Sequence, residues 1–414
     1  MYIETLGIQA KEAEVQIAQL STSVKNEVLL KSAEALIENC ENILKINEED
    51  VTNAKNSGVK DAFIDRLTLT EKRIKDMADG LKQIASLNDP VGEFTYGKTL
   101  ANGLIIQQKR VPLGVIAIIF ESRPNVTADA FGLCLKSGNA VILRGGKEAI
   151  KTNIAIVNIF KSVLKSCGLN ENAVQIVENT SHEIANELMK AHKYIDVLIP
   201  RGSARLINTV INNSTVPCIQ TGVGNCHIFV DESANIENAI NIIINAKTQR
   251  PGVCNAVETL LIHKNIASKI LPSLGEELIN QNVEIRGDET VRKYIEKSLE
   301  ASEEDWATEY EDYIVAIKTV EDLDEVIKHI GKYGTKHSES IITENYSNAQ
   351  RFLNEIDAAA VYVNASTRFT DGGQFGFGAE IGISTQKLHA RGPMGLKELT
   401  TTKYVIMGNG QVRK

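Results

Sequence analysis

The stretch Val115-Ile116-Ala117-Ile118-Ile119-Phe120 decides the fold, because all six of its residues are apolar. A strand with one solvated face alternates apolar and polar residues, whereas an unbroken apolar run is typical of a parallel strand covered on both faces. Similar short runs follow, with helix-length segments between them, at residues 140–143, 174–177, 195–199 and 218–220. This alternation predicts repeated βα units and therefore an α/β fold with a doubly wound parallel sheet.

A second αβ series lies further along the chain, with strand-like runs at residues 257–263, 283–285, 313–317, 340–343 and 360–364. Because 414 residues exceed one ordinary hydrophobic core, we expect two αβ domains. Residues 8–88 precede both series and are expected to be helical, since apolar residues recur there at helical spacing. The glycine-rich residues 366–385 are expected to form an extended loop.

A β-hairpin is expected where Asn102-Gly103 separates two β-prone flanks. A type I′ turn needs positive φ at two successive residues, and this pair supplies it. The apolar run Leu104-Ile105-Ile106 would leave an exposed strand edge unless something pairs with it. The hairpin is therefore either an oligomerisation arm or a surface hairpin lying on its own domain. The β-prone residues 400–407 are expected to form a strand that pairs with such a hairpin of another subunit.

Composition excludes several classes of protein. The hydrophobic content of 43%, the charged content of 24% and the net charge of −8 fit a globular protein without a nucleic-acid partner. The segment Met1-Tyr2-Ile3 does not begin a signal peptide, and no run of apolar residues is long enough for a membrane span. Six cysteines without CxxC spacing and seven histidines without an HxxxH pair indicate reduced thiols, a cytoplasmic location and no metal.

Cys254 is the candidate nucleophile, in Gln249-Arg250-Pro251-Gly252-Val253-Cys254-Asn255-Ala256. A helix-periodic run precedes this segment and a strand-like run follows it, so the Pro-Gly pair places the thiol at a break between regular elements. The neighbouring Arg250 favours the thiolate form. The alternative is that Cys254 is a small buried hydrophobic residue.

The carboxyl ends of four predicted strands carry polar segments. They are Glu121-Ser122-Arg123-Pro124-Asn125, Arg144-Gly145-Gly146-Lys147, Pro200-Arg201-Gly202-Ser203 and Thr221-Gly222-Val223-Gly224-Asn225. Cations next to small residues are typical of sites where backbone N–H groups and helix N-termini bind phosphates. Each segment taken singly is equally consistent with an ordinary turn. No GxGxxG motif follows the first strand, so a standard Rossmann site is not predicted.

Several distinctive segments occur in a fixed order along nearly the whole chain. They are Pro112-Leu113-Gly114-Val115 before the segment that begins at Glu121, Lys136-Ser137-Gly138-Asn139 leading to Arg144-Gly145-Gly146-Lys147, Thr221-Gly222-Val223-Gly224-Asn225-Cys226-His227, Arg250-Pro251-Gly252-Val253-Cys254-Asn255-Ala256, His337-Ser338-Glu339-Ser340-Ile341, and Asn364-Ala365-Ser366-Thr367-Arg368-Phe369. Together they resemble the aldehyde dehydrogenase superfamily and, within it, the γ-glutamyl phosphate reductase family of proline biosynthesis.

The resemblance implies an aldehyde dehydrogenase-like architecture of two doubly wound αβ domains with a projecting β oligomerisation element. Residues 1–92 and 111–226 would then form the cofactor-binding domain, and residues 227–385 the catalytic domain. Residues 93–110 and 396–414 would supply the oligomerisation hairpin and strand. A homodimer or a larger homo-oligomer is therefore expected.

The same resemblance assigns roles to individual residues. Cys254 matches the nucleophile of the superfamily, and Asn125 matches the side-chain donor of the oxyanion hole. The residues implied for cofactor binding are Arg144, Lys147, Gly202, Ser203, Gly222 and Glu309. Glu309 resembles the glutamate that holds the nicotinamide ribose, with an exposed helix-end carboxylate as the alternative. The candidates for the substrate phosphate and α-carboxylate are Arg123, Arg250 and Arg368, each of which is alternatively a structural ion pair.

Two departures from other aldehyde dehydrogenases carry chemical information. Lys147 lies where NAD-using relatives tend to place a glutamate that binds the ribose 2′-hydroxyl and repels a 2′-phosphate, so NADPH is the expected cofactor. Gln220 lies where hydrolytic relatives place a water-activating glutamate, and a neutral amide cannot accept the proton. Slow thioester hydrolysis is expected, which suits a reductase.

The implied reaction is the NADPH-dependent reduction of L-glutamyl 5-phosphate to L-glutamate 5-semialdehyde, through a thioester on Cys254. The alternatives are a non-phosphorylating NAD(P)-dependent aldehyde dehydrogenase and a non-catalytic nucleotide-binding relative. No kinase-like region precedes the cofactor domain, so the γ-glutamyl kinase that makes the substrate is expected to be a separate chain that forms a transient complex with this one. Neither nucleic acid nor membrane is expected as a partner.

Overall fold

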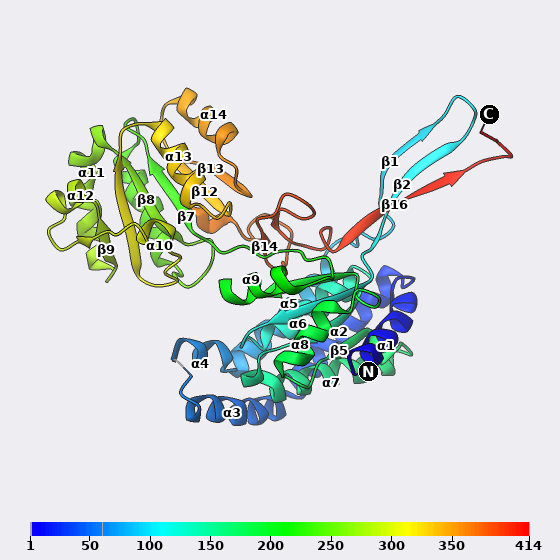
Figure 1. Ribbon diagram of the computed structural model, residues 1–414. Helices are drawn as coiled ribbons and strands as arrows, with labels where there is room; N and C mark the ends of the chain where they lie inside the picture. Colours follow the sequence, from blue (N-terminus) through cyan, green and yellow to red (C-terminus); the bar gives the residue numbers. More distant parts are fainter. Residues whose placement is uncertain (1, 60, 414) are drawn as a thin grey trace. The chain divides into compact units, whose positions relative to one another are not determined.

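The computed structural model describes residues 2–59 and 61–413 and divides into two compact units. Unit 1 comprises Met1–Thr221, Gly376–Gly382 and Met394–Lys414, and unit 2 comprises Gly222–Phe375 and Ile383–Pro393. Each unit contains a parallel sheet with helices on it, which confirms the predicted α/β fold (Figure 1). The cofactor, catalytic and oligomerisation roles given to ranges of the sequence stay predictions, and residues 1, 60 and 414 of those ranges lie outside the described residues.

The sheet of unit 1 has the strand order β5-β4-β3-β6, and all its neighbouring strands are parallel. Its central strand β3 (Val115–Phe120) is buried throughout, as the unbroken apolar run predicts. The neighbours are β4 (Ala140–Arg144), β5 (Val174–Ile176) and β6 (Val197–Arg201). The strand expected at residues 218–220 is present only as a single bridge between Leu198 and Cys218. Pro217, directly before Cys218, has no N–H to donate to a ladder.

Helices cover both faces of this sheet, as Figure 1 shows for the blue to green part of the chain. They are α1 (Tyr2–Ile17), α2 (Thr22–Glu38), α3 (Cys40–Asn56), α4 (Asp61–Leu67), α5 (Glu71–Ser86), α6 (Asn125–Lys136), α7 (Ile150–Ser166), α8 (His182–Lys190) and α9 (Ala204–Asn213), with short 3₁₀ turns η1 (Lys147–Ala149) and η2 (Glu171–Ala173). The helical prediction for residues 8–88 is confirmed. Ser21 and Thr70 begin α2 and α5, because each hydroxyl accepts a backbone N–H that the first turn leaves free.

An antiparallel ribbon of β1 (Phe94–Thr99), β2 (Ile105–Pro112) and β16 (Thr400–Met407) also belongs to unit 1 (Figure 1). The hairpin is present, but its turn differs from the expected type I′. Leu100 N–H bonds to Leu104 O at 2.8 Å, so the loop has three residues, and of Asn102 and Gly103 only Gly103 has positive φ, at 86°. Residues 400–407 were expected to pair with a hairpin of another subunit, but as β16 they pair with β2 of their own chain over eight residues.

The sheet of unit 2 has seven parallel strands in the order β10-β9-β11-β8-β7-β12-β13. They are β7 (Cys226–Val230), β8 (Val257–His263), β9 (Glu284–Gly287), β10 (Leu299–Glu300), β11 (Ile314–Val320), β12 (Ser338–Ile342) and β13 (Ala360–Val363). The five predicted strands are confirmed: the run 257–263 has the predicted bounds, and the ends of the other four differ from the prediction by at most three residues. Strands β7 and β10 were not predicted, and the first two residues of β7 were read as part of a site motif.

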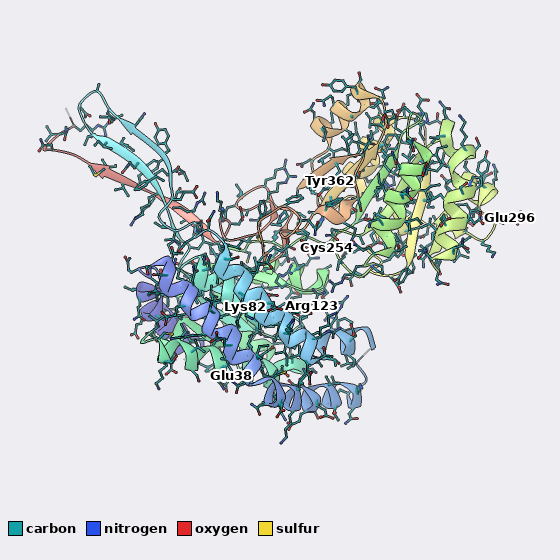
Figure 2. The ribbon with its side chains drawn as sticks, turned by 180° about the vertical axis from the view of Figure 1, so that it is seen from behind. Glu38, Lys82, Arg123, Cys254, Glu296 and Tyr362 are labelled. Atoms are coloured by element: carbon teal, nitrogen blue, oxygen red, sulfur yellow. The ribbon has the colours of Figure 1, made fainter. Side chains whose placement is uncertain are left out.

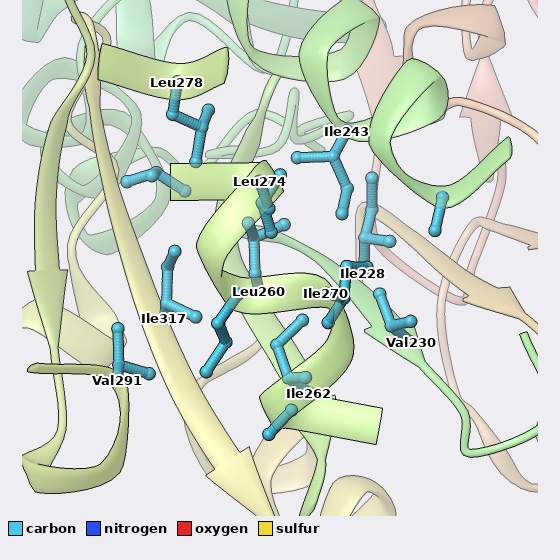
Figure 3. Packing of buried hydrophobic residues seen from close by; sticks show 14 of the residues in the cluster. Ile228, Val230, Ile243, Leu260, Ile262, Ile270, Leu274, Leu278, Val291 and Ile317 are labelled. Atoms are coloured by element: carbon cyan, nitrogen blue, oxygen red, sulfur yellow. The ribbon is translucent and has the colours of Figure 1, made fainter. Parts of the chain in front are cut away.

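The core of unit 2 lies on both faces of β8, whose seven residues are all buried. On one face, Leu260 and Ile262 pack with Ile270 and Leu274 (Figure 3). On the other face, Leu261 packs with residues of α13 and α14. The helices are α10 (Ile236–Thr248), α11 (Lys264–Asn280), α12 (Glu289–Tyr294), α13 (Leu323–Tyr333) and α14 (Tyr346–Glu355), with 3₁₀ turns η3 (Asp305–Ala307) and η4 (Thr367–Phe369).

The glycine-rich segment expected at residues 366–385 is largely irregular and contains η4 and β14 (Ile383–Ser384), which pairs with β15 (Gly392–Pro393). Among the described residues, no helix combines the length and apolar character that crossing a membrane requires. In residues 2–59 and 61–413, no group of three or more His, Cys, Asp or Glu side chains is suited to a metal ion.

Candidate active site

Cys254 lies on a turn between the end of α10 and the start of β8, as the sequence predicts (Figure 2). Its side chain is half-buried, so it is not a residue of the hydrophobic core. The turn is closed by a hydrogen bond from Ala256 N–H to Val253 O, at 3.0 Å. A thiol on such a turn can face a substrate while the strand behind it stays rigid.

Gly224 fixes the backbone of this turn by close approach. A Cβ atom at Gly224 would lie 1.6 Å from the Cys254 carbonyl oxygen, so only glycine fits here. The buried Cys226 donates its S–H to the same oxygen, with 3.1 Å between Sγ and O. The carbonyl side of the nucleophile is thus packed against the segment that leads into β7.

Asn255 connects the turn to η4. Its side-chain amide donates to Thr370 O at 2.8 Å, and its own carbonyl accepts the Thr367 hydroxyl at 2.8 Å. Its Oδ1 accepts a hydrogen bond from Arg368, whose Nε also donates to Gln249 Oε1 at 3.0 Å. Burial and the positive charge of Arg250 lower the pKa of Arg368, and Arg250 belongs to the segment that leads to Cys254.

Glu309 is half-buried in an irregular segment after η3, so the alternative of an exposed helix-end carboxylate does not fit. Its Oε1 accepts the backbone N–H of Gly224 at 2.7 Å. Burial raises the pKa of Glu309 to about 7, against the Gly224 hydrogen bond and the charge of Lys247, which lower it. This carboxylate therefore contacts the same glycine that packs on Cys254.

Asn125 is the first residue of α6 in unit 1 and its side chain is exposed. One turn later, Asp129 accepts a hydrogen bond from the Asn125 amide nitrogen at 3.2 Å. Burial raises the pKa of Asp129 to about 6, while this hydrogen bond and the charge of Arg201 oppose the rise. The second N–H of the Asn125 amide has no bond to Asp129 and is available for an oxyanion. Arg123 lies half-buried two residues before α6.

The two cations predicted for the cofactor differ in their surroundings. Lys147 is exposed in η1, directly after the carboxyl end of β4. Arg144 is half-buried at the end of β4, and its Nη2 donates to Thr180 O at 2.8 Å. Lys147 is therefore the more accessible of the two for an anionic group.

The N-terminus of α9 already holds an anion. The Glu121 carboxylate accepts the Ser203 N–H at 2.9 Å and the Ser203 hydroxyl at 2.7 Å. A Cβ at Gly202 would lie 2.6 Å from this carboxylate. The two donors of Ser203 are of the kind that bind the oxygens of a phosphate at a helix N-terminus, and Gly202 leaves room for the anion beside them.

Cys254, Arg250, Arg368, Gly222 and Glu309 belong to unit 2, and the remaining predicted site residues belong to unit 1. Those in unit 1 are Asn125, Arg123, Arg144, Lys147, Gly202 and Ser203. Sequence reasoning missed the contacts made by Glu121, Asp129, Gly224 and Asn255. The segments that contain Glu121 and Gly224 were singled out, but nothing in a linear motif names the partner of a side chain.

The model of the aldehyde dehydrogenase family matches residues 3–293 of the chain. The chain belongs to the aldehyde dehydrogenase family. Among its relatives, the gamma-glutamyl phosphate reductase of Caldanaerobacter subterraneus subsp. tengcongensis is 61% identical over 414 residues, which cover 100% of both chains. The protein of that name from Carboxydothermus hydrogenoformans is 61% identical over 408 residues, 99% of this chain and 98% of its own.

Among solved structures, the gamma-glutamyl phosphate reductase of Thermotoga maritima has a TM-score of 0.97, 51% identity and complete coverage of both chains. Membership in the aldehyde dehydrogenase family implies a nicotinamide cofactor for this chain. It also places the strand orders above in a fold shared with that solved relative over its full length.

Proposed function

We propose that the protein reduces L-glutamyl 5-phosphate to L-glutamate 5-semialdehyde with NADPH and release of phosphate, a step of proline biosynthesis. The observation that carries the proposal is the half-buried Cys254 on a turn that shares hydrogen bonds with the segment bearing Arg368. Relatives over the full chain that are named gamma-glutamyl phosphate reductase support the same reaction.

In the proposed mechanism, the Cys254 thiolate attacks the γ-acyl phosphate carbon and Asn125 donates a hydrogen bond to the oxyanion. Phosphate leaves as the C–O bond to the acyl carbon breaks, which gives a thioester on Cys254. A nicotinamide cofactor held by the residues named below would supply the hydride that reduces the thioester to the aldehyde. When the C–S bond breaks, the thiolate is restored. Gln220 provides no carboxylate base for water, so the thioester is reduced and not hydrolysed.

The residues that would hold the cofactor fit its groups. Lys147, an exposed cation after β4, suits the 2′-phosphate of NADPH. Ser203, which binds the Glu121 carboxylate in the structure, and the adjacent Gly202 suit the pyrophosphate, and Glu309 suits the ribose hydroxyls. Arg144 and Gly222 complete the proposed set.

Arg123, Arg250 and Arg368 are proposed to bind the anionic groups of the substrate. Two neighbouring guanidinium groups repel each other, and a phosphate or carboxylate between them would remove that repulsion. Gln249 and Asn255 hold Arg368 in place for this role.

The test is the reverse reaction, oxidation of L-glutamate 5-semialdehyde by NADP or NAD, with and without phosphate. We expect turnover only with phosphate or arsenate, a preference for NADP, and less than a tenth of the activity in Cys254→Ser. Phosphate-independent formation of glutamate would establish the alternative, a non-phosphorylating aldehyde dehydrogenase. A Cys254→Ser variant that keeps more than a tenth of the activity would reject the nucleophile.

We further propose that the protein acts in the cytoplasm as a homodimer or larger homo-oligomer through the ribbon of β1, β2 and β16. The ribbon exposes apolar side chains that a second copy would cover, among them Phe94, Tyr404 and Ile406. A transient complex with the γ-glutamyl kinase would shorten the path of the labile acyl phosphate.

A further inference from the structure

Unit 2 contains a fully buried ion pair that contacts the two residues following Glu309. Lys247 comes from the last turn of α10 and Glu258 from the second position of β8, and neither side chain is exposed to solvent. The Lys247 ammonium nitrogen lies 2.5 Å from Glu258 Oε2. The second oxygen, Oε1, accepts the backbone N–H of Glu311 at 3.3 Å.

Stability alone does not explain this pair. Two charges removed from water lose their hydration, and well-packed apolar residues of similar volume often give an equal or higher stability. Burial accordingly lowers the pKa of Lys247 and raises the pKa of Glu258, while the opposite charge of each partner offsets the shift. A role for the pair must therefore lie in the contacts that Lys247 and Glu258 make with other residues.

Those contacts go to the two residues that follow Glu309. Besides the bond from Glu311 N–H to Glu258, the Lys247 ammonium lies 6.0 Å from the ring centroid of Tyr310. Glu311 has a φ of 52°, which is unfavourable for a residue with a side chain and persists only where neighbouring groups hold it. Glu258 holds it by accepting its N–H.

The other end of this segment is fixed by Asp305. Its carboxylate accepts hydrogen bonds from the Ser302 backbone at 2.6 Å, from Tyr310 at 2.8 Å and from Arg286 at 2.6 Å. Glu309 lies between these two anchors and reaches Gly224, which packs on the Cys254 carbonyl. The position of the Glu309 carboxylate relative to the nucleophile therefore depends on both anchors.

We propose that Lys247 and Glu258 are positioning residues that hold the Glu309 carboxylate where it accepts the ribose hydroxyls on the nicotinamide side of the cofactor. The inference rests on the proposed role of Glu309. Neither residue of the pair touches the cofactor; both act through Tyr310 and Glu311. The positive charge of Lys247 also favours the ionised Glu309 carboxylate, the better acceptor.

The test compares Lys247→Met/Glu258→Leu with Lys264→Met/Glu321→Leu, which removes an exposed pair of the same unit. Both double variants remove one positive and one negative charge, so neither leaves an unpaired buried charge. The dissociation constants of NADPH and NADP are measured by titration with the full chain. Trp306 is the one tryptophan of the sequence and lies in η3, next to the segment that bears Glu309. Its fluorescence emission therefore reports the arrangement of that segment when no cofactor is bound.

We expect the buried-pair variant to bind NADPH about tenfold more weakly, with a shifted Trp306 emission and a KM for semialdehyde within twofold of the unaltered protein. The exposed-pair variant should change none of these. A buried-pair variant that folds and binds NADPH with unchanged affinity overturns the inference. If it does not fold, Glu258→Gln replaces it, with an expected threefold weaker binding; unchanged binding overturns the inference equally.

Glu309→Gln separates this inference from the proposed function. If Glu309→Gln weakens NADPH binding and the buried-pair variant does not, the positioning role is wrong and the role of Glu309 stands. If Glu309→Gln leaves NADPH binding unchanged, the proposed role of Glu309 is wrong, and the positioning inference is overturned with it. The phosphate requirement of the reaction is unaffected by either result and tests the activity itself.

Discussion

We expect Gly224→Ala to displace the turn that bears Cys254 while leaving the Cys254 thiol chemically unaltered. The added Cβ would lie 1.6 Å from the Cys254 carbonyl oxygen and 2.5 Å from its Cα. These are backbone atoms, so contact can be relieved only if the turn moves by roughly 1.5 Å, since carbon and oxygen pack at about 3 Å or more. A misplacement of about 1 Å at a reacting atom costs about a hundredfold in rate. We therefore expect kcat for phosphate-dependent semialdehyde oxidation to fall at least a hundredfold.

The same change should lower the free energy of unfolding by about 1–3 kcal/mol, the usual cost of overpacking. Gly331→Ala is the matched control, because a Cβ there meets nothing within 4 Å and Gly331 lies inside α13. It should leave kcat unchanged and add up to about 1 kcal/mol of stability through helix propensity. Thermal melts and thiol titration accompany the kinetics. A Gly224→Ala protein with more than a third of the original kcat would refute the reasoning.

Three further outcomes are expected. Asn125→Ala should lower kcat by two to three orders of magnitude, about 3 kcal/mol, with little change in substrate KM; a loss below tenfold in steady-state assays would remove Asn125 from the oxyanion hole. Lys147→Glu should raise the KM for NADPH about tenfold or more and leave that for NADH within twofold, and an unchanged ratio of the two would contradict the cofactor assignment. Burial lowers the pKa of His329 to about 3 and that of His337 to about 4, so below about pH 6.5 the unfolded chain binds protons that the folded chain does not. The contribution of each imidazole to the free energy of unfolding should fall by about 1.4 kcal/mol per pH unit as the pH drops from about 6 to 4, while the raised pKa values of Asp129 and Glu309 act in the opposite direction. Urea melts in which the difference in unfolding free energy between the unaltered protein and His329→Phe stays constant over that range would disprove it.

Helices, strands and breaks that leave a strong local pattern in the chain could be predicted from the sequence. The unbroken apolar run 115–120 is a buried strand with the predicted bounds, because burial on both faces leaves a continuous pattern in the chain. The strand-like run 257–263 also has the predicted bounds, although it includes the polar residues Glu258, Thr259 and His263. The Pro-Gly pair before Cys254 fixed the break that carries the thiol. The order of the site segments was enough to identify the family.

The contacts between side chains of different elements could be seen only in the tertiary structure. The close approach of Gly224 to Cys254, the bond between Asn255 and Arg368, and the pairing of Lys247 with Glu258 join residues from different elements of the folded unit. Even the hairpin turn, local as it is, took three residues in place of two, because the strand pairing sets its length. Propensity and periodicity describe each element separately, whereas a hydrogen bond across the fold depends on how the elements pack, and a linear pattern does not record that.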